Sequence, residues 1–341
     1  MSARVPVLLL VAAALLGIIT ATGVESSPSG ASLPLETYAT EARAGTPPFP
    51  VVERAARNAR QVDGWSGMVR FLTSHVQRFS DDATNSYYLT VVADLYRENQ
   101  AIPVARQYYR RALFAYPDVR VRGVSAHRVA INRLLEIVSD GEERLLYLSY
   151  LQEHYAGEVD PGLVAYYLGR AYQANGDWDH AYRAYRDFLA YPDTKVPGEP
   201  EAREIIGRRI AFFDSSKSWV RRDLDDLVTS IKTALWTQNS RNLLRYRAGV
   251  NFFTMSWEQE EGDANSEIPT FDIAAFLRRS RVRYSQDLEL SSNASEAYLR
   301  TWGWSHRIPT WYLYFRRVDY PADPDIHGTW EWAGIYFGET L

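Results

Sequence analysis

Apolar residues follow two different spacings along the 341-residue chain. Between residues 50 and 215 they recur every three or four positions, which is the spacing of amphipathic helices. Towards the C-terminus they alternate with polar residues, as in RVRYSQDLEL (281–290), which is the spacing of strands. The pattern therefore predicts a helical region over 50–215, followed by an α+β domain over 220–341.

Two segments of the helical region, 86–118 and 162–193, match each other position by position over most of their length. Each carries a small residue, a tyrosine one helical turn later, a turn residue, an alanine, an aromatic residue and a closing proline. The matched positions are Ala93 and Gly169, Tyr96 and Tyr172, Gln100 and Gly176, Ala105 and Ala181, Tyr109 and Tyr185, and Pro117 and Pro192. This order predicts two antiparallel helices that pack closely through their small residues.

The matched segments resemble the tetratricopeptide repeat, a 34-residue helix-turn-helix unit. Both lack the tryptophan usual near the start of that repeat and carry Leu89 and Ala165 there. Residues 51–79 (two helices around Gly64) and 125–157 supply further helix pairs, and the segment after Pro200 supplies a closing helix. The resemblance implies an α-helical solenoid of about four repeats over 50–215.

The resemblance also implies that the first helix of each unit lines a concave groove that holds a protein or peptide partner. The residues at the inward positions are Tyr87, Thr90, Asp94, Arg97, Leu163, Tyr166, Arg170 and Gln173. Tyrosine offers rigid aromatic area and arginine a forked donor for carboxylates, which suits peptide recognition. A solvated groove edge is the alternative interpretation.

The C-terminal region predicts helices first and strands afterwards. Residues 223–248 read as one helix, or as two helices broken near Asn239, and 271–280 as a short helix capped by Thr270. The predicted strands are 250–257, 281–290, 296–304, 310–318 and 329–338. Such an order favours a mostly antiparallel sheet of about four or five strands with helices over one face.

Aromatic residues crowd the last strands, as in WGWSHRIPTWYLYF (302–315). Alternation places Trp311, Leu313 and Phe315 on one face, and Tyr312 and Tyr314 on the other. In the last strand it places Trp330, Trp332 and Tyr336 together. We consider three interpretations: core and cross-strand pairs, a docking surface, or a cleft for a small molecule, peptide or glycan. The candidate cleft residues are Trp302, Trp304, Tyr312, Tyr314, Trp330 and Trp332.

The N-terminus predicts export. Arg4 precedes an apolar run from Val5 to Ile19, and small residues follow at Ala21 and Gly23, which is typical of a signal peptide over 1–23. An uncleaved membrane tether through residues 5–23 is the alternative. Residues 24–49, rich in Ser, Pro, Gly and Ala, predict a flexible linker. Nearly all basic residues are arginine, a bias of GC-rich bacterial genomes, so we expect a periplasmic or cell-envelope location.

Composition and motifs narrow the function. The net charge of −4 gives no overall basic field for nucleic acid, and the chain has no cysteine. Gly-rich phosphate loops, HExxH and GxSxG are absent from the sequence, so we expect neither a cofactor nor a metal, and no catalytic residues. The sequence favours a binding scaffold accessory to an envelope assembly or transport machine. The alternatives are a ligand- or glycan-binding module, or a hydrolase, in the aromatic domain.

Overall fold

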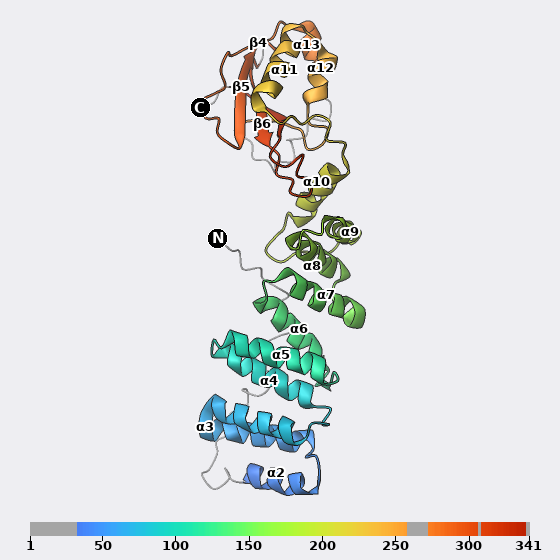
Figure 1. The fold of residues 1–341 in the computed structure, drawn as a ribbon, viewed down its shortest axis with the longest axis vertical. Helices are drawn as coiled ribbons and strands as arrows, with labels where there is room; N and C mark the ends of the chain where they lie inside the picture. Colours follow the sequence, from blue (N-terminus) through green and yellow to red (C-terminus); the bar gives the residue numbers. More distant parts are fainter. Residues whose placement is uncertain (1–32, 258–271, 306–307, 339–341) are drawn as a thin grey trace. The chain divides into compact units, whose positions relative to one another are not determined.

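The computed structural model describes residues 33–257, 272–305 and 308–338. The chain divides into two compact units, Met1–Pro200 (unit 1) and Glu201–Leu341 (unit 2) (Figure 1). The predicted signal peptide or tether and the first part of the predicted linker lie outside the described residues. Within the described ranges, no helix is both long enough and apolar enough to cross a membrane.

Unit 1 consists of helices that pack on one another in chain order, and α4 also packs on α6 (Figure 1). A two-stranded hairpin, β1 (Arg120–Val121) and β2 (Val124–Ser125), connects α5 to α6. The helices are α2 (Leu33–Ala44), α3 (Phe49–Arg78), α4 (Asn85–Glu98), α5 (Ile102–Ala115), α6 (Ala126–Ile137), α7 (Gly141–Tyr155), α8 (Pro161–Ala174) and α9 (Trp178–Leu189). The prediction of a helical region is confirmed.

The two matched segments form the helix pairs α4–α5 and α8–α9, and they share their local geometry. Gln100 and Gly176, the predicted turn residues, both have positive φ angles, 61° and 74°. A β-carbon on Gly169 would lie 2.5 Å from ring atoms of Tyr185, so the small residue of α8 packs directly on the aromatic residue of α9. Aspartate side chains cap the first turns of α8 and α9, where Asp160 and Asp177 accept backbone N–H groups.

The segment predicted as a flexible linker contains a helix, α2, and that part of the prediction is wrong. Tertiary contacts hold α2 on α3: the Tyr38 ring packs edge-on against Phe71 at 4.8 Å. Arg78 Nη2 also donates to the carbonyl oxygen of Ala42 at 2.7 Å. Gly64 (φ 68°, ψ −161°) interrupts α3, so the predicted break there is confirmed.

His75 on α3 is fully buried and connects α2 to the loop that follows α3. Its Nδ1 lies 3.0 Å from the hydroxyl of Tyr38, and its Nε2 lies 3.0 Å from Asp82 Oδ2. Burial lowers the pKa of His75 below 6.5, and the hydrogen bond that Asp82 accepts from the ring opposes this shift. His127 on α6 is also buried, and burial likewise lowers its pKa.

We predict that unit 1 loses stability as the pH falls below about 6.5. Both histidines have a lower pKa in the folded chain than in the unfolded chain, where it is about 6.5. As the pH falls from 6.5 towards the lowered values, the unfolded chain binds more protons than the folded chain, so the free energy of unfolding decreases. His75→Gln should reduce the difference in unfolding free energy between pH 7.5 and 5, measured by urea denaturation. An unchanged pH dependence in His75→Gln and in His127→Gln would contradict this.

Unit 2 holds a five-stranded sheet in the order β3-β7-β6-β5-β4. Strand β3 runs parallel to β7 and the other pairs are antiparallel, which confirms the mostly antiparallel sheet. The strands are β3 (Phe253–Ser256), β4 (Arg283–Tyr284), β5 (Glu296–Trp302), β6 (Thr310–Arg317) and β7 (Trp330–Phe337), and the helices are α10 (Ala202–Asp214), α11 (Leu224–Trp236), α12 (Ser240–Tyr246) and α13 (Ile273–Arg279).

The core of unit 2 lies between one face of the sheet and its helices. Leu227, Ile231 and Leu235 of α11 are buried in one cluster with Leu299 of β5 and Leu313 of β6. Of the two interpretations of residues 223–248, the structure has the two helices broken near Asn239, because Asn239 caps α12 by accepting the N–H of Asn242. The helices therefore cover one face of the sheet, as the sequence predicted.

Three predicted boundaries differ in the structure. The closing helix α10 belongs to unit 2, where Phe212 packs on Trp219 and Tyr320, so the boundary lies at residue 200 rather than 215. Asp272 caps α13 by accepting the N–H of Ala275, in place of the predicted Thr270, which lies outside the described residues.

The predicted strand over 281–290 is also shorter than expected. The N–H of Ser285 bonds Arg300 and that of Glu289 bonds Tyr298. Residues 285 and 289 are four apart, but their partners on β5, residues 300 and 298, are only two apart. The residues between 285 and 289 therefore do not pair regularly with β5. Leu290, at the end of the predicted alternation, is fully exposed.

Candidate functional site

The structure places most of the predicted groove residues in the interior of unit 1. On α4, Tyr87, Thr90 and Asp94 are at most 2% exposed, and Arg97 is half-buried. On α8, Leu163 and Tyr166 are buried, whereas Arg170 has a 43% exposed side chain. Gln173 is half-buried and accepts a hydrogen bond from Tyr185.

Five of the eight predicted groove residues therefore do not present a surface to a partner, and that part of the prediction is corrected. The physical reason is that α4 packs on α3, α5 and α6, and α8 packs on α7 and α9. A helix that packs against neighbours on several sides buries most of its side chains. The candidate surface is reduced to the charged residues near the C-terminal ends of the two helices.

A charged network joins α4 to α6 at this surface. Asp94 accepts a hydrogen bond of 2.5 Å from the Tyr109 hydroxyl, and Arg97 and Arg133 lie 3.7 and 3.5 Å from the same oxygen. Glu136 pairs with Arg133 at 3.1 Å and with Arg97 at 3.7 Å. Burial raises the pKa of the Asp94 carboxyl, and the hydroxyl and the guanidinium groups oppose this shift.

Sequence reasoning missed Arg133 and Glu136. Their signal was a pair of opposite charges three residues apart in the helix HRVAINRLLEIV.

Two of the predicted groove residues on α8, Tyr166 and Arg170, bind a carboxylate of the chain itself. Glu199 accepts hydrogen bonds from the Tyr166 hydroxyl and from Arg170 Nη1, each at 2.6 Å. Burial, followed by the hydrogen bond to Glu199, raises the pKa of Tyr166 to about 12. Glu199 belongs to residues 191–200, which we call the turn segment. The sequence offered no signal for this contact.

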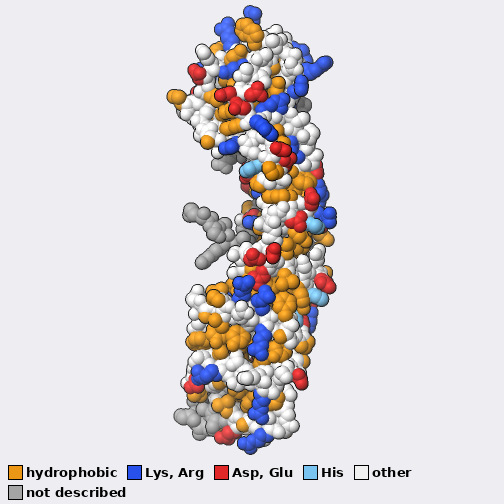
Figure 2. All heavy atoms as spheres, in the orientation of Figure 1, with side chains coloured by type: hydrophobic (Ala, Val, Ile, Leu, Met, Phe, Trp, Pro, Cys, Tyr) orange, Lys and Arg blue, Asp and Glu red, His pale blue; other side chains and the backbone are white. Residues whose placement is uncertain are grey.

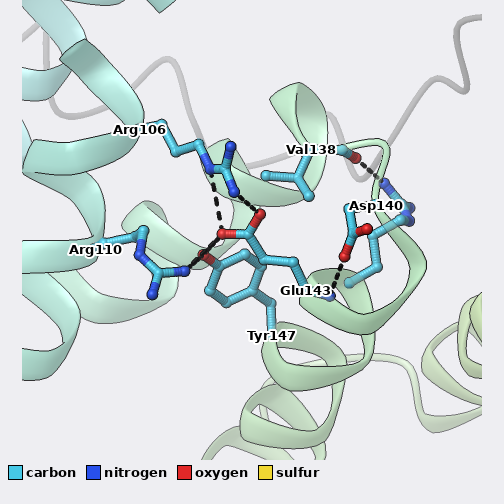
Figure 3. Close-up of polar contacts among 7 residues, drawn as sticks. Arg106, Arg110, Val138, Asp140, Glu143 and Tyr147 are labelled. Atoms are coloured by element: carbon cyan, nitrogen blue, oxygen red, sulfur yellow. Dashed lines mark hydrogen bonds and ion pairs between the residues drawn. The ribbon is translucent and has the colours of Figure 1, made fainter. Parts of the chain in front are cut away.

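A second charged cluster fastens α5 to α7 (Figure 3). The Glu143 carboxylate, 8% exposed, accepts hydrogen bonds from Arg106, from Arg110 Nη1 at 2.6 Å and from the Tyr147 hydroxyl at 2.6 Å. Burial acts to raise the pKa of Glu143, but the hydrogen bonds from Tyr147, Arg110 and Arg106 outweigh it and lower the pKa. Because one partner is buried and the arginines come from a different helix, this cluster fixes how the two helices pack.

Charges of both signs are interspersed with apolar side chains on the face of unit 1 that Figure 2 shows. A continuous basic surface of the kind that binds nucleic acid is not visible there.

The candidate cleft of unit 2 is not assembled, because its six residues lie on opposite faces of the sheet. Trp304 and Trp332 are buried in the core beneath the helices, and Trp330 packs against that core. Trp304 stacks on Trp311 at 4.6 Å. Residues 302, 312 and 314 face the other way, as the alternation along β5 and β6 requires. Three of the six candidate cleft residues, Trp304, Trp330 and Trp332, therefore belong to the core of unit 2 or pack against it.

A β-bulge explains why the faces of the last strand were wrongly predicted. The pairing register shifts between Tyr314 and Phe315, which pair with Gly334 and Trp332 and leave Ala333 as the extra residue. Every side chain after Ala333 therefore changes face. Tyr336 joins Tyr314 and Phe253, opposite Trp330 and Trp332.

The sheet face away from the helices carries a group of rings that we call the aromatic face: Phe253, Trp257, Tyr298, Tyr312, Tyr314 and Tyr336. Trp257 stacks on Tyr336 at 4.2 Å, and its buried Nε1 has no hydrogen-bond partner in the described structure. Glu296 accepts hydrogen bonds from the Tyr298 and Tyr314 hydroxyls at 3.2 and 3.0 Å. Burial, followed by the charge of Glu296, raises the pKa of Tyr298 to about 12.

Within the described ranges, no three His, Asp or Glu side chains come together as a metal site would require. No protein-family model matches the chain, and no curated protein matches it. The resemblance to the tetratricopeptide repeat therefore remains a prediction from residues 86–118 and 162–193.

Proposed function

We propose that the chain is an exported scaffold of the bacterial periplasm or cell envelope, in which a tetratricopeptide-type solenoid holds a protein partner. Two features support the finer fold: the matched turn residues Gln100 and Gly176 share a positive φ, and Gly169 packs on Tyr185 as the repeat requires. Export rests on Arg4 and the apolar run that follows it. An accessory role in envelope assembly or transport would use such a scaffold.

The observation that carries the proposal is the presence of partly exposed charged residues towards the C-terminal ends of α4, α6 and α8. Arg97 and Glu136 connect α4 to α6, and Arg170 remains 43% exposed on α8. Arginine binds carboxylates and backbone carbonyls through a planar fork of donors, and it is enriched in protein interfaces. Binding, rather than catalysis, is what this arrangement can do.

We expect the double variant Arg97→Glu with Arg170→Glu to lower capture of an envelope partner at least about tenfold. Each substitution removes a charge-assisted hydrogen-bond donor, worth about 1.5–3 kcal/mol, and replaces it with a like charge for an acidic partner. The measurement is capture by the tagged protein from solubilised envelopes, with partners identified by mass spectrometry.

The matched control is Arg183→Glu with Arg241→Glu, which makes the same charge change at exposed positions on α9 and α12. Urea denaturation of both double variants checks that unit 1 stays folded. If the two double variants captured the partner equally well, Arg97 and Arg170 would not form the binding surface.

The aromatic face favours a second candidate function, a module that binds a sugar or another flat ligand. Trp257, Tyr298 and Tyr336 are half-buried, and the unpartnered indole N–H of Trp257 is a donor for a hydroxyl. We expect soluble peptidoglycan fragments to change the tryptophan emission of the wild-type chain and to change that of Trp257→Phe less. No change in the wild-type emission at millimolar ligand would remove this candidate.

A further inference from the structure

Two side chains one helical turn apart on α8 hold a carboxylate that belongs to neither α8 nor α9. Tyr166 uses its hydroxyl for one oxygen of Glu199, and Arg170 uses Nη1 for the other, so both oxygens of the carboxylate are engaged. Charge-assisted hydrogen bonds of this kind are shorter and stronger than neutral ones. The position is therefore a built receptor for a carboxylate, seen with the chain's own glutamate in place.

The turn segment presents that glutamate from a tight turn. The N–H of Glu199 bonds the carbonyl of Val196, and Gly198 has a φ of 77°. Proline at the second position and glycine at the third are the residues that a type II turn favours, and Pro197 and Gly198 occupy them. The turn thus fixes where the carboxylate points.

The contact is placed where another carboxylate can replace it. The Arg170 side chain is 43% exposed and that of Glu199 is 34% exposed, whereas Tyr166 is buried. Half-exposed ion pairs are weak, because water stabilises both partners after separation. If Glu199 leaves, the buried Tyr166 hydroxyl needs another acceptor, and the carboxylate of a partner supplies one.

A second positive charge lies near Arg170. Arg144 of α7 lies close enough for the two guanidinium charges to repel, and its own hydrogen bonds go to the carbonyl oxygens of Leu135 and Val138. On α4 the position matched to Arg170 is Asp94, an acid. A partner that is acidic opposite α8 therefore fits this surface.

We propose that the partner of the scaffold carries an acidic segment whose glutamate or aspartate binds Tyr166 and Arg170, and that in the free protein the turn segment occupies this site. The inference rests on the proposed function, because it names the chemistry of the partner that the scaffold holds. Binding then exchanges Glu199 for the partner's carboxylate. The turn segment competes with the partner, so the partner's apparent affinity is reduced in proportion to the fraction of molecules in which the site is empty.

The test uses the full chain and a fluorescent peptide of alternating Glu and Gly, with a Gln and Gly peptide as the control. Fluorescence anisotropy measures the affinity of each peptide for the wild type, Glu199→Ala, Glu199→Gln, and Glu199→Ala with Arg170→Ala. We expect both single variants to bind the Glu peptide about tenfold more tightly than the wild type. Adding Arg170→Ala should abolish this gain.

Equal affinity of the wild type and both Glu199 variants would overturn the proposal, since Glu199 would not compete. Equal binding of the Gln peptide would also overturn it, since the carboxylate would not be recognised. Capture of the envelope partner tests the proposed function separately. If capture depends on Arg97 and Arg170 but not on Glu199, the scaffold stands and the exchange fails.

Discussion

Replacement of Gly169 by alanine is expected to lower the free energy of unfolding of unit 1 by about 2–3 kcal/mol, because the added methyl group overpacks a helix contact. Its β-carbon would lie 2.5 Å from Cδ1 and Cε1 of Tyr185, closer than real contacts allow. The ring cannot move away easily: Tyr185 is 2% exposed and its hydroxyl donates to Gln173. The helices α8 and α9 must therefore separate, which loosens contacts along both.

A glycine on another helix provides the matched control. Gly207 of α10 has no atom within 4 Å of an added β-carbon. Gly207→Ala should therefore raise the stability of unit 2 by about 0.5–1 kcal/mol, the ordinary gain in helix propensity. Urea denaturation of each variant gives the sign. Tyr185→Leu combined with Gly169→Ala should recover part of the loss, and equal effects of alanine at Gly169 and Gly207 would contradict the close contact.

Features that depend on a few adjacent residues were predictable from the sequence. Breaks at Gly64 and Asn239 follow from residues that end or cap helices, and both occur where expected. The faces of β6 follow from strict alternation, because the strand has no irregularity before Tyr314. Gln100 and Gly176 adopt the positive φ that a tight helix-helix turn requires.

Features that depend on distant partners were not predictable. The inward positions of α4 are buried because α3, α5 and α6 all pack on that helix, and no pattern within α4 reports its neighbours. Glu199 reaches Tyr166 from 33 residues away. The bulge at Ala333 changes the face of Tyr336 through the register of a neighbouring strand. The sequence thus predicted Arg97 and Arg170 as candidate site residues, but it did not predict that Glu199 binds Arg170.

Replacement of Glu143 by alanine is expected to destabilise unit 1 by about 2–4 kcal/mol. The substitution leaves the buried Tyr147 hydroxyl and the arginines of α5 without their shared acceptor (Figure 3). Loss of one partner from a buried pair costs about 3–5 kcal/mol, and the half-exposed arginines recover part of this through water. Glu143→Gln should cost less, because its amide oxygen can still accept from Tyr147.

The neighbouring Glu142 distinguishes this interaction from a general effect of acidic residues in the first turn of α7. Glu142 is exposed, so Glu142→Ala should change stability by no more than about 0.5 kcal/mol. Because hydrogen bonds lower the pKa of Glu143, its contribution should disappear as the pH falls through that lowered value. Urea denaturation at pH 7 and pH 3.5 measures both effects. If Glu143→Ala and Glu142→Ala were equally stable at pH 7, the cluster would not hold α5 against α7.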